Sequence, residues 1–295
     1  MSIDLGNSSI PSTITAAIQQ HTGPISDITP VGGGCIAHAT RLSAAKGTFF
    51  VKWGMHHVAK TFGAEAAGLD ALRVAGSPLL IPEVISIESG EQGYILLEWL
   101  NQGHASTQSW EAFGRGLAAL HRTSVQAFGL DEDNFIGRSP QVNDTRDTWP
   151  EFFRDCRLEP QVQMAREAGR WPEEWNGYLD NLYNRLERLI PAQPEASLVH
   201  GDLWGGNFMT LTNGKVALID PAVYYGHREV DLAMTELFGG FKKIFYEAYW
   251  EAWPVEDGYS ERKELYNLYH LLNHLNLFGA SYERGVEKVL KRFGD

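Results

Sequence analysis

Hydrophobic residues near the start of the chain follow two different periods. Isoleucines recur at helical spacing between a candidate cap at Ser9 and a stop at Gly23, which predicts an amphipathic N-terminal helix. The apolar runs that follow are short and extended, and they predict strands over residues 25–31, 35–42 and 48–53. This order of elements is typical of a β-meander that follows one helix.

The period becomes helical again over residues 62–73, where a glycine and then a proline follow the last apolar position. Two further apolar runs, over residues 82–88 and 94–100, flank a polar segment that contains two glycines. Such a segment favours a turn, so the two runs predict a pair of antiparallel strands.

Beyond residue 100 the apolar residues fall mostly at helical spacing, and short strands are predicted only near residues 198–200 and 216–219. The pattern therefore predicts an α+β protein of two lobes. We expect a strand-rich N-terminal lobe over residues 1–100 and a larger, mainly α-helical lobe over residues 101–295.

Composition narrows the class of partner. The chain has 295 residues, 43% of them hydrophobic and 21% charged, as in ordinary globular proteins. Its 25 basic and 37 acidic residues give a formal net charge of −12, which disfavours a general nucleic-acid or anionic-membrane surface. The positive charge of any phosphate-binding site must therefore come from a few neighbouring groups, because the net charge of the chain is negative.

Two features bear on location. Cys35 and Cys156 are too few for a disulfide framework and suit a reducing compartment. The chain shows neither a signal-peptide pattern nor a run of about 18 apolar residues. We therefore expect a soluble cytoplasmic protein without a membrane partner.

The strongest chemical motif is His200-Gly-Asp-Leu-Trp-Gly-Gly-Asn207, which a hydrophobic run and Asp220 follow. Phosphoryl transfer from ATP needs a carboxylate that orients and deprotonates the attacking hydroxyl, and oxygen ligands that hold Mg²⁺ on the phosphates. Asp202 fits the base, and Asn207 and Asp220 fit the metal ligands. The competing interpretation is a glycine-rich turn in which Asp and Asn cap local backbone.

A second motif joins a strand to a helix. Lys52 lies within the apolar run of residues 48–53, and Glu65 shares the apolar face of the helix over residues 62–73. A buried charge is costly unless it is paired, so each side chain would stabilise the other. In kinases such a pair orients a lysine on the nucleotide phosphates. The alternative places Lys52 on an exposed edge strand.

Gly32, Gly33 and Gly34 lie between two predicted strands, where backbone N–H groups could approach phosphates. Three glycines are equally typical of a flexible hairpin. Cys35 follows directly; beside oriented N–H groups its thiol could be reactive, although a small buried hydrophobic role is the more common one.

Two further segments carry polar residues. Only ten residues separate Asp220 from Asp231, too few for a long regulatory activation segment; Asp231 either caps the next helix or also braces the catalytic loop. Near the C-terminus Asn267, His270 and His274 share one helix face, where they either bind a polar substrate or serve as solvated or core residues.

Taken together, these residues resemble the kinase-like small-molecule phosphotransferases, a group that includes aminoglycoside phosphotransferases and choline kinases. The resemblance is greatest to the fructosamine/ketosamine kinase family. It rests on residues 200–207, on residues 219–232, on Asn273-His-Leu-Asn276 and on a third region with Asn134-Phe-Ile-Gly137, Pro140-Gln141, Trp149, Phe152-Phe153 and Pro160-Gln161.

The resemblance implies a bilobal protein-kinase-like fold that uses ATP and Mg²⁺. It also implies phosphorylation of the sugar 3-hydroxyl of a ketosamine, of the ribulosamine, erythrulosamine or fructosamine type, on a small amine or a glycated protein lysine. The 3-phosphate would then eliminate and free the amine. Two alternatives stay open: a kinase for an aminoglycoside- or choline-like alcohol, and an inactive nucleotide-binding scaffold.

Roles carried over from the family fall on individual residues. They imply that Asp202 is the base and that Asn207 and Asp220 hold the metal. Trp204 and His274 would contact the sugar, and Cys35 could act in redox-linked dimerisation. The positions implied to bind the nucleotide are Gly32, Gly33, Gly34, Lys52, Glu65, Glu98, Trp99 and Leu100. We accordingly expect a monomer or a redox-sensitive homodimer.

Overall fold

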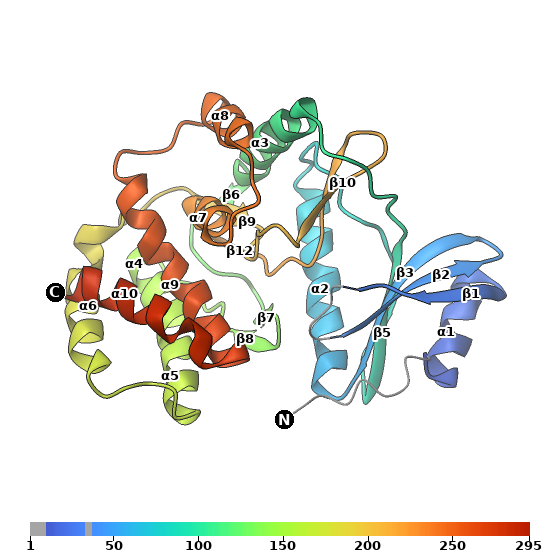
Figure 1. Ribbon diagram of the computed structural model, residues 1–295, viewed down its shortest axis with the longest axis horizontal. Helices are drawn as coiled ribbons and strands as arrows, with labels where there is room; N and C mark the ends of the chain where they lie inside the picture. Colours follow the sequence, from blue (N-terminus) through green and yellow to red (C-terminus); the bar gives the residue numbers. More distant parts are fainter. Residues whose placement is uncertain (1–9, 33–36) are drawn as a thin grey trace.

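The computed structural model describes residues 10–32 and 37–295, and its N-terminal part is built on one antiparallel sheet of five strands (Figure 1). The strands lie in the order β1-β2-β3-β5-β4, with bounds β1 Ile25–Pro30, β2 His38–Ala44, β3 Gly47–Met55, β4 Val84–Glu88 and β5 Gln92–Glu98. Lys52 is in the central strand β3, opposite Ala39 of β2 and Ile95 of β5. The prediction of a β-meander is confirmed, and the edge-strand alternative for Lys52 is wrong.

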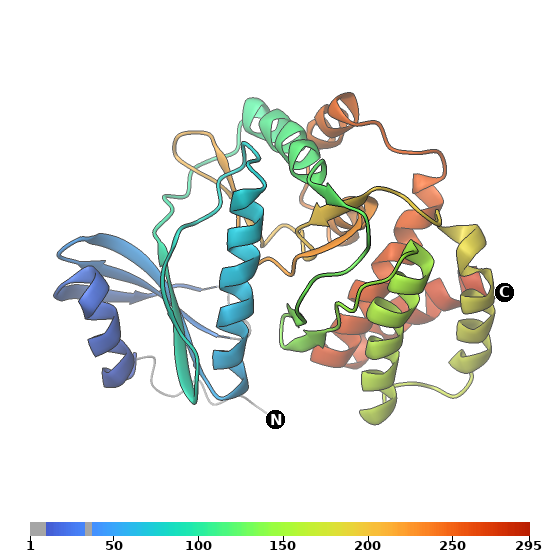
Figure 2. The same cartoon turned by 180° about the vertical axis from the view of Figure 1, so that it is seen from behind.

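One helix packs on each face of this sheet. Helix α1 (Ser12–Thr22) buries its isoleucines against Val51, Trp53 and Leu96. Helix α2 (His57–Val74) buries Phe62, Leu69 and Leu72 on the opposite face. Helix α2 therefore lies between the sheet and the rest of the molecule, as both views show (Figures 1 and 2).

The remaining part of the chain is mainly helical. The helices are α3 Thr107–His121, α4 Trp149–Phe152, the π-helix η1 Phe153–Leu158, α5 Glu159–Glu167, α6 Trp175–Leu189, α7 Glu229–Leu237, α8 Lys243–Ala252, α9 Tyr259–Phe278, the 3₁₀ turn η2 Ala280–Tyr282 and α10 Glu283–Gly294. Short antiparallel strands join in the groups β12-β9-β6, β10-β11 and β7-β8, with bounds β6 Ser124–Val125, β7 Asn134–Ile136, β8 Ser139–Gln141, β9 Ala196–Val199, β10 Phe208–Thr210, β11 Val216–Leu218 and β12 Tyr224–His227.

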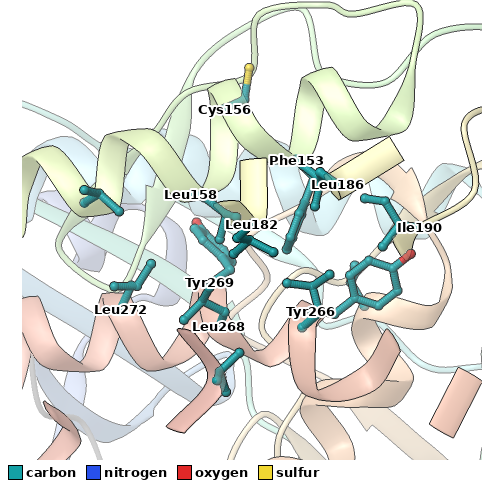
Figure 3. Close-up of a cluster of buried hydrophobic side chains, with 14 of the residues drawn as sticks. Phe153, Cys156, Leu158, Leu182, Leu186, Ile190, Tyr266, Leu268, Tyr269 and Leu272 are labelled. Atoms are coloured by element: carbon teal, nitrogen blue, oxygen red, sulfur yellow. The ribbon is translucent and has the colours of Figure 1, made fainter. Parts of the chain in front are cut away.

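The core of this helical part forms where η1, α6 and α9 meet. Figure 3 shows Phe153 and Leu158 of η1 facing Leu182 of α6 and Tyr269 of α9, and all four are buried. Cys156 is buried at the edge of this cluster, and burial raises the pKa of its thiol. No helix in the described part of the chain is long and apolar enough to cross a membrane.

The structure corrects several predicted bounds. Helix α2 begins five residues before the predicted start, at His57, and β3 extends to Met55. The strands predicted near residues 198–200 and 216–219 exist as β9 and β11, but they pair with different partners in separate sheets. Pairing depends on residues distant in sequence, which local periodicity does not report. The α+β class is confirmed, whereas the division at residue 100 stays a prediction.

Candidate active site

The motif around Asp202 forms a loop between β9 and β10, facing the N-terminal sheet. It borders a cavity of about 410 Å³ to which both parts of the chain contribute. The N-terminal part supplies Ala37, Ala39, Lys52, Thr61, Phe62, Ala64 and Glu65, and the helical part supplies Asn134, Phe135, Gly137, Asp202, Trp204, Gly206, Asn207, Asp220, Pro221, Asn273, His274, Leu277 and Phe278. The main chemical candidates therefore converge on one space.

Lys52 lies between two carboxylates in this cavity. Its Nζ is 2.8 Å from Glu65 Oε1 and also makes an ion pair with Asp220. Burial disfavours the charged lysine, but Asp220 and Glu65 together raise its pKa above the ordinary value. Burial also raises the pKa of Glu65, against the opposing effect of Lys52. The ammonium is thus held charged at the wall of the cavity.

Asp202 and Asn207 form a second polar pair across one turn of the loop. Asn207 Nδ2 donates to the Asp202 carbonyl at 2.8 Å and to Asp202 Oδ2 at 3.0 Å. Burial, with a smaller contribution from the charge of Asp220, raises the pKa of Asp202 to about 7. A carboxylate with a pKa near neutrality is suited to accept and release a proton under ordinary conditions.

Asp231 holds the start of the same loop from behind. Its two oxygens accept the backbone N–H groups of His200 at 2.7 Å and Gly201 at 2.9 Å. Oδ2 is also 3.1 Å from His121 Nε2, and His121 Nδ1 is 2.8 Å from the Tyr249 hydroxyl. Helix α7 begins at Glu229 with Arg228 as its N-cap, so Asp231 does not cap it. Its carboxylate instead braces the loop.

Two backbone conformations give the loop its shape. Gly201 has φ +82°, and a Cβ there would lie 2.0 Å from the Ala222 carbonyl oxygen. Asp220 has φ +54°, a left-handed conformation that is uncommon outside glycine. His200 joins the two segments, since its Nε2 is 2.9 Å from the Ile219 carbonyl oxygen. Close packing of two loops thus sets where both aspartates lie.

Aromatic side chains border the open side of the cavity. Trp204 is 40% exposed, and its indole lies where a Cβ on Gly206 would approach within 2.4 Å. His274 is half-buried in α9, with Nδ1 2.8 Å from the His270 carbonyl oxygen, and burial lowers its pKa. A neutral imidazole and an indole face can both contact a polyhydroxy substrate.

Comparison with known proteins agrees with this geometry. The family model for fructosamine kinase matches residues 9–294, nearly the whole chain. The chain belongs to the fructosamine kinase family. It is 42% identical over 287 residues to a "Probable ketoamine kinase" of Synechocystis, covering 95% of each chain. It is 34% identical to the chloroplastic protein-ribulosamine 3-kinase of Arabidopsis thaliana, covering 90% of this chain and 82% of that protein.

Solved structures place this fructosamine kinase family member in a wider fold group. A provisionally named fructosamine-3-kinase from Thermobifida fusca has a TM-score of 0.85 at 31% identity, covering 97% of this chain and 98% of that one. An aminoglycoside phosphotransferase in ternary complex with AMP-PNP and hygromycin B has a TM-score of 0.65 at 17% identity, covering 95% and 98%. The second likeness shows the fold alone: a kinase-like phosphotransferase fold.

Some predicted nucleotide residues are not among those that line the cavity just described. Glu98 ends β5, where Oε1 accepts the Glu83 N–H at 3.0 Å, and Trp99 Nε1 donates to Asn101. Neither these two nor Leu100 is among the lining residues. Of the glycine segment, Gly32 is exposed, and a Cβ there would meet no described heavy atom within 4 Å. Gly33, Gly34 and Cys35 lie outside the described residues.

Sequence reasoning missed how the family-specific region is supported. Strands β7 and β8 form a hairpin that brings Asn134 to the cavity. Behind it lies Arg157, fully buried, with hydrogen bonds to the carbonyls of Val142 and Cys156 and to Asn143 Oδ1. Its guanidinium also lies 3.8 Å from the centroid of the Tyr224 ring. Buried arginines are rare, and nothing in the segment Phe153–Leu158 distinguishes the buried Arg157 from the partly exposed Arg154, so the sequence offered no signal.

A metal ion would find hard oxygen ligands here. Because the amide nitrogen of Asn207 makes both hydrogen bonds to Asp202, its oxygen is left for another group. The Asp220 carboxylate lines the same cavity. Among the described residues, no three or more His, Cys, Asp or Glu side chains are grouped so that they could hold a metal ion by themselves. This sparse set fits Mg²⁺, which takes one or two carboxylates and completes its shell with substrate phosphates and water.

Proposed function

We propose that this member of the fructosamine kinase family transfers the γ-phosphoryl group of ATP to the 3-hydroxyl of a ketosamine, with Mg²⁺ as cofactor. The observation that carries the proposal is the convergence of Lys52, Asp202, Asn207 and Asp220 on one cavity. Acceptors are small ketosamines or glycated lysines of proteins, with ribulosamine as the first candidate because relatives carry that name.

The acceptor reacts at the Asp202 carboxylate. Asn207 occupies Oδ2 with its amide N–H, so Oδ1 is the atom available to the substrate hydroxyl. As the hydroxyl oxygen bonds to the γ-phosphorus, the bond from that phosphorus to the β–γ bridging oxygen breaks and ADP leaves. The hydroxyl proton passes to Asp202 Oδ1 and then to water. Catalysis of this type is mainly positioning and charge stabilisation.

The nucleotide end depends on Lys52. Glu65 keeps the ammonium in place and charged, so that it can bind the phosphates as a point charge. Asp220 and Asn207 would hold Mg²⁺, which neutralises the phosphate charge when it is bound. Lys52 has two carboxylate partners but needs only Glu65 to orient it, which leaves Asp220 for the metal.

Acceptor choice is tested by a panel assayed side by side. Ribulose-, erythrulose- and fructose-lysine are compared with an aminoglycoside and choline, by ADP release and by mass spectrometry of the phosphorylated product. We expect a 3-phosphate on at least one ketosamine and no turnover of the other two classes. Preferred phosphorylation of an aminoglycoside or of choline would replace the proposed acceptor, and no turnover of any compound would indicate an inactive scaffold.

The assigned base is tested with Asp202→Asn beside Asp70→Asn, which alters a carboxylate on α2 whose side chain is 69% exposed. We expect Asp202→Asn to lose at least about a thousandfold in kcat while it still binds ATP, because proton transfer and hydroxyl positioning both fail. Asp70→Asn should turn over normally. Wild-type kcat in the Asp202 variant would exclude that residue as the base.

A further inference from the structure

A chain of aromatic rings continues outward from the cavity. We call it the aromatic rim, and it consists of Trp204, Phe238, His274, Phe278 and Tyr282. The ring centroids are 6.5 Å apart for Trp204 and Phe238, and 5.0 Å apart for Phe238 and His274. His274 is 5.3 Å from Phe278 and 4.9 Å from Tyr282. These rings come from the catalytic loop, the end of α7, α9 and η2.

The aromatic rim is unusually open. Among the described residues, the large hydrophobic side chains that are exposed include four aromatic rings: Trp204 at 40%, Phe238 at 44%, Phe278 at 49% and Trp250 at 38%. Three of these four belong to the rim. Exposed aromatic rings that gather in one place mark a binding surface more often than rings that are scattered singly.

Local backbone keeps the rings at the surface. Gly206 leaves room for the Trp204 indole, which a Cβ would displace. The chain turns directly after Phe238 through Gly239 at φ +71° and Gly240 at φ +96°, conformations that favour glycine. Phe238 thus follows the last residue of α7 at an exposed position, and it extends the rim beyond the residues that line the cavity.

The rim is continuous with the acceptor end of the cavity. Trp204, His274 and Phe278 line the same cavity as Asp202, whereas Phe238 and Tyr282 lie outside it. In a ketosamine the amine is bonded to C1, two carbons from the reacting C3. With the 3-hydroxyl at Asp202, the part of the substrate beyond the amine must leave through the open side of the cavity.

The charges suit a cationic group there. Lys52 is the one basic lysine or arginine among the lining residues, and it is paired with Glu65 and Asp220. His274, at the centre of the rim, has a pKa below its ordinary value because of burial, so it is neutral at pH 7. The secondary amine of a ketosamine is protonated at that pH, and aromatic faces attract such cations.

We propose that the aromatic rim, outward from Trp204 and His274 where the sugar is expected, binds the amine carrier of the substrate: the protonated amine, its alkyl stem and, for a glycated lysine in a polypeptide, the adjoining residues. This inference rests on the proposed function and deepens it, because it makes a peptide-borne ketosamine a better substrate than the same sugar on a minimal amine.

The test compares two acceptors with the same sugar: a short peptide that contains ribulosyl-lysine, and the ribulose adduct of methylamine. We measure the ratio of their kcat/KM values in the wild type, Phe238→Ala, Phe238→Leu and Trp250→Ala. Trp250 is the matched control, an exposed aromatic ring of α8 outside the rim. Thermal denaturation checks that each variant is folded.

We expect the wild type to favour the peptide. The protonated amine is common to both acceptors, so the ratio reports the alkyl stem and the adjoining residues, and Phe238→Ala should lower it about fourfold, through the KM of the peptide, for each methylene group of the stem that loses its contact. Phe238→Leu should lose part of this preference, and Trp250→Ala should stay within about twofold of the wild type. An unchanged ratio in Phe238→Ala would overturn the rim as a carrier site. If Phe238→Ala changes the oligomeric state but not the ratio, the carrier site is also overturned, and the rim is instead a contact surface for a second copy of the chain. If the wild type phosphorylates neither acceptor, the proposed function fails instead.

Discussion

The brace formed by Asp231 gives the sharpest test of how the fold sets the chemistry. Asp231 is 1% exposed, and its two oxygens accept hydrogen bonds from the backbone of His200 and Gly201 and from His121. In Asp231→Asn one oxygen becomes an NH₂ group, so at least one of these donors faces another donor. An unsatisfied buried donor and a lost charge-assisted hydrogen bond together cost about 3 kcal/mol.

This loss should be visible in both stability and turnover. The chain has 295 residues, and unfolding entropy is about 2.1 cal/mol/K per residue, so a loss of about 3 kcal/mol lowers Tm by roughly 5 °C. The catalytic loop also loses its support, and a shift of about 1 Å at Asp202 would lower kcat on the order of a hundredfold. Asp180→Asn, on the exposed side of α6, serves as the control and should change neither quantity.

The pH dependence adds an independent check. Despite burial, the hydrogen bond and charge of His121 keep the pKa of Asp231 below its ordinary value. A depressed carboxylate pKa stabilises the fold fully above the unfolded pKa of about 4, and this contribution is lost as pH falls through the folded-state pKa. The Tm difference between Asp231→Asn and wild type should therefore persist at pH 7 and shrink in acid. A Tm within about 2 °C of wild type at pH 7, with wild-type kcat, would refute the brace.

Three further outcomes follow from the same site. Gly201→Ala should lose more than about 3 kcal/mol of stability in thermal denaturation, because its Cβ would lie 2.0 Å from a backbone oxygen. Gly214→Ala is the control: Gly214 has φ +78° but open surroundings, so this variant should lose only about 1 kcal/mol. Equal losses in the two variants would contradict the steric reasoning. Burial raises the pKa of Asp202 to about 7, so the charged form of this carboxylate opposes folding. Asp202→Asn should therefore have a higher Tm than wild type at pH 8 but not at pH 4. A difference in Tm that does not depend on pH would argue against a raised pKa. Arg157→Leu should lower the free energy of unfolding by about 2 to 4 kcal/mol, because the arginine's buried hydrogen bonds are lost. Because Arg157 supports the β7–β8 hairpin, the variant should also raise the KM for the acceptor more than the KM for ATP. Equal changes in the two KM values, measured by steady-state kinetics, would contradict a local role.

Several features of the site could be predicted from local pattern. Lys52 in an apolar strand and Glu65 on an apolar helix face each needed a partner, and their 2.8 Å ion pair is present. The spacing of Asp202 and Asn207 within one short loop likewise brings their side chains together. These predictions rest on contacts within a few elements and on the cost of burying an unpaired charge, both of which the sequence reports directly.

Other features could not be predicted, because they join segments far apart in the chain. Asp231 follows His200 by 31 residues, and nothing in either segment says that its carboxylate accepts that backbone N–H. Arg157 was overlooked because a buried guanidinium with neutral partners is recognised only once the hairpin it supports is known.

Periodicity and the cost of charge burial act over short distances, so the alternation of strands and helices, the ion pair of Lys52 and the polar loop at Asp202 could be predicted from local pattern. The brace that Asp231 gives to that loop, and the line of rings from four separate elements in the aromatic rim, are established by tertiary contacts alone. The physical reason is that packing between distant segments selects among many locally acceptable arrangements, and only the folded chain reveals which one was selected.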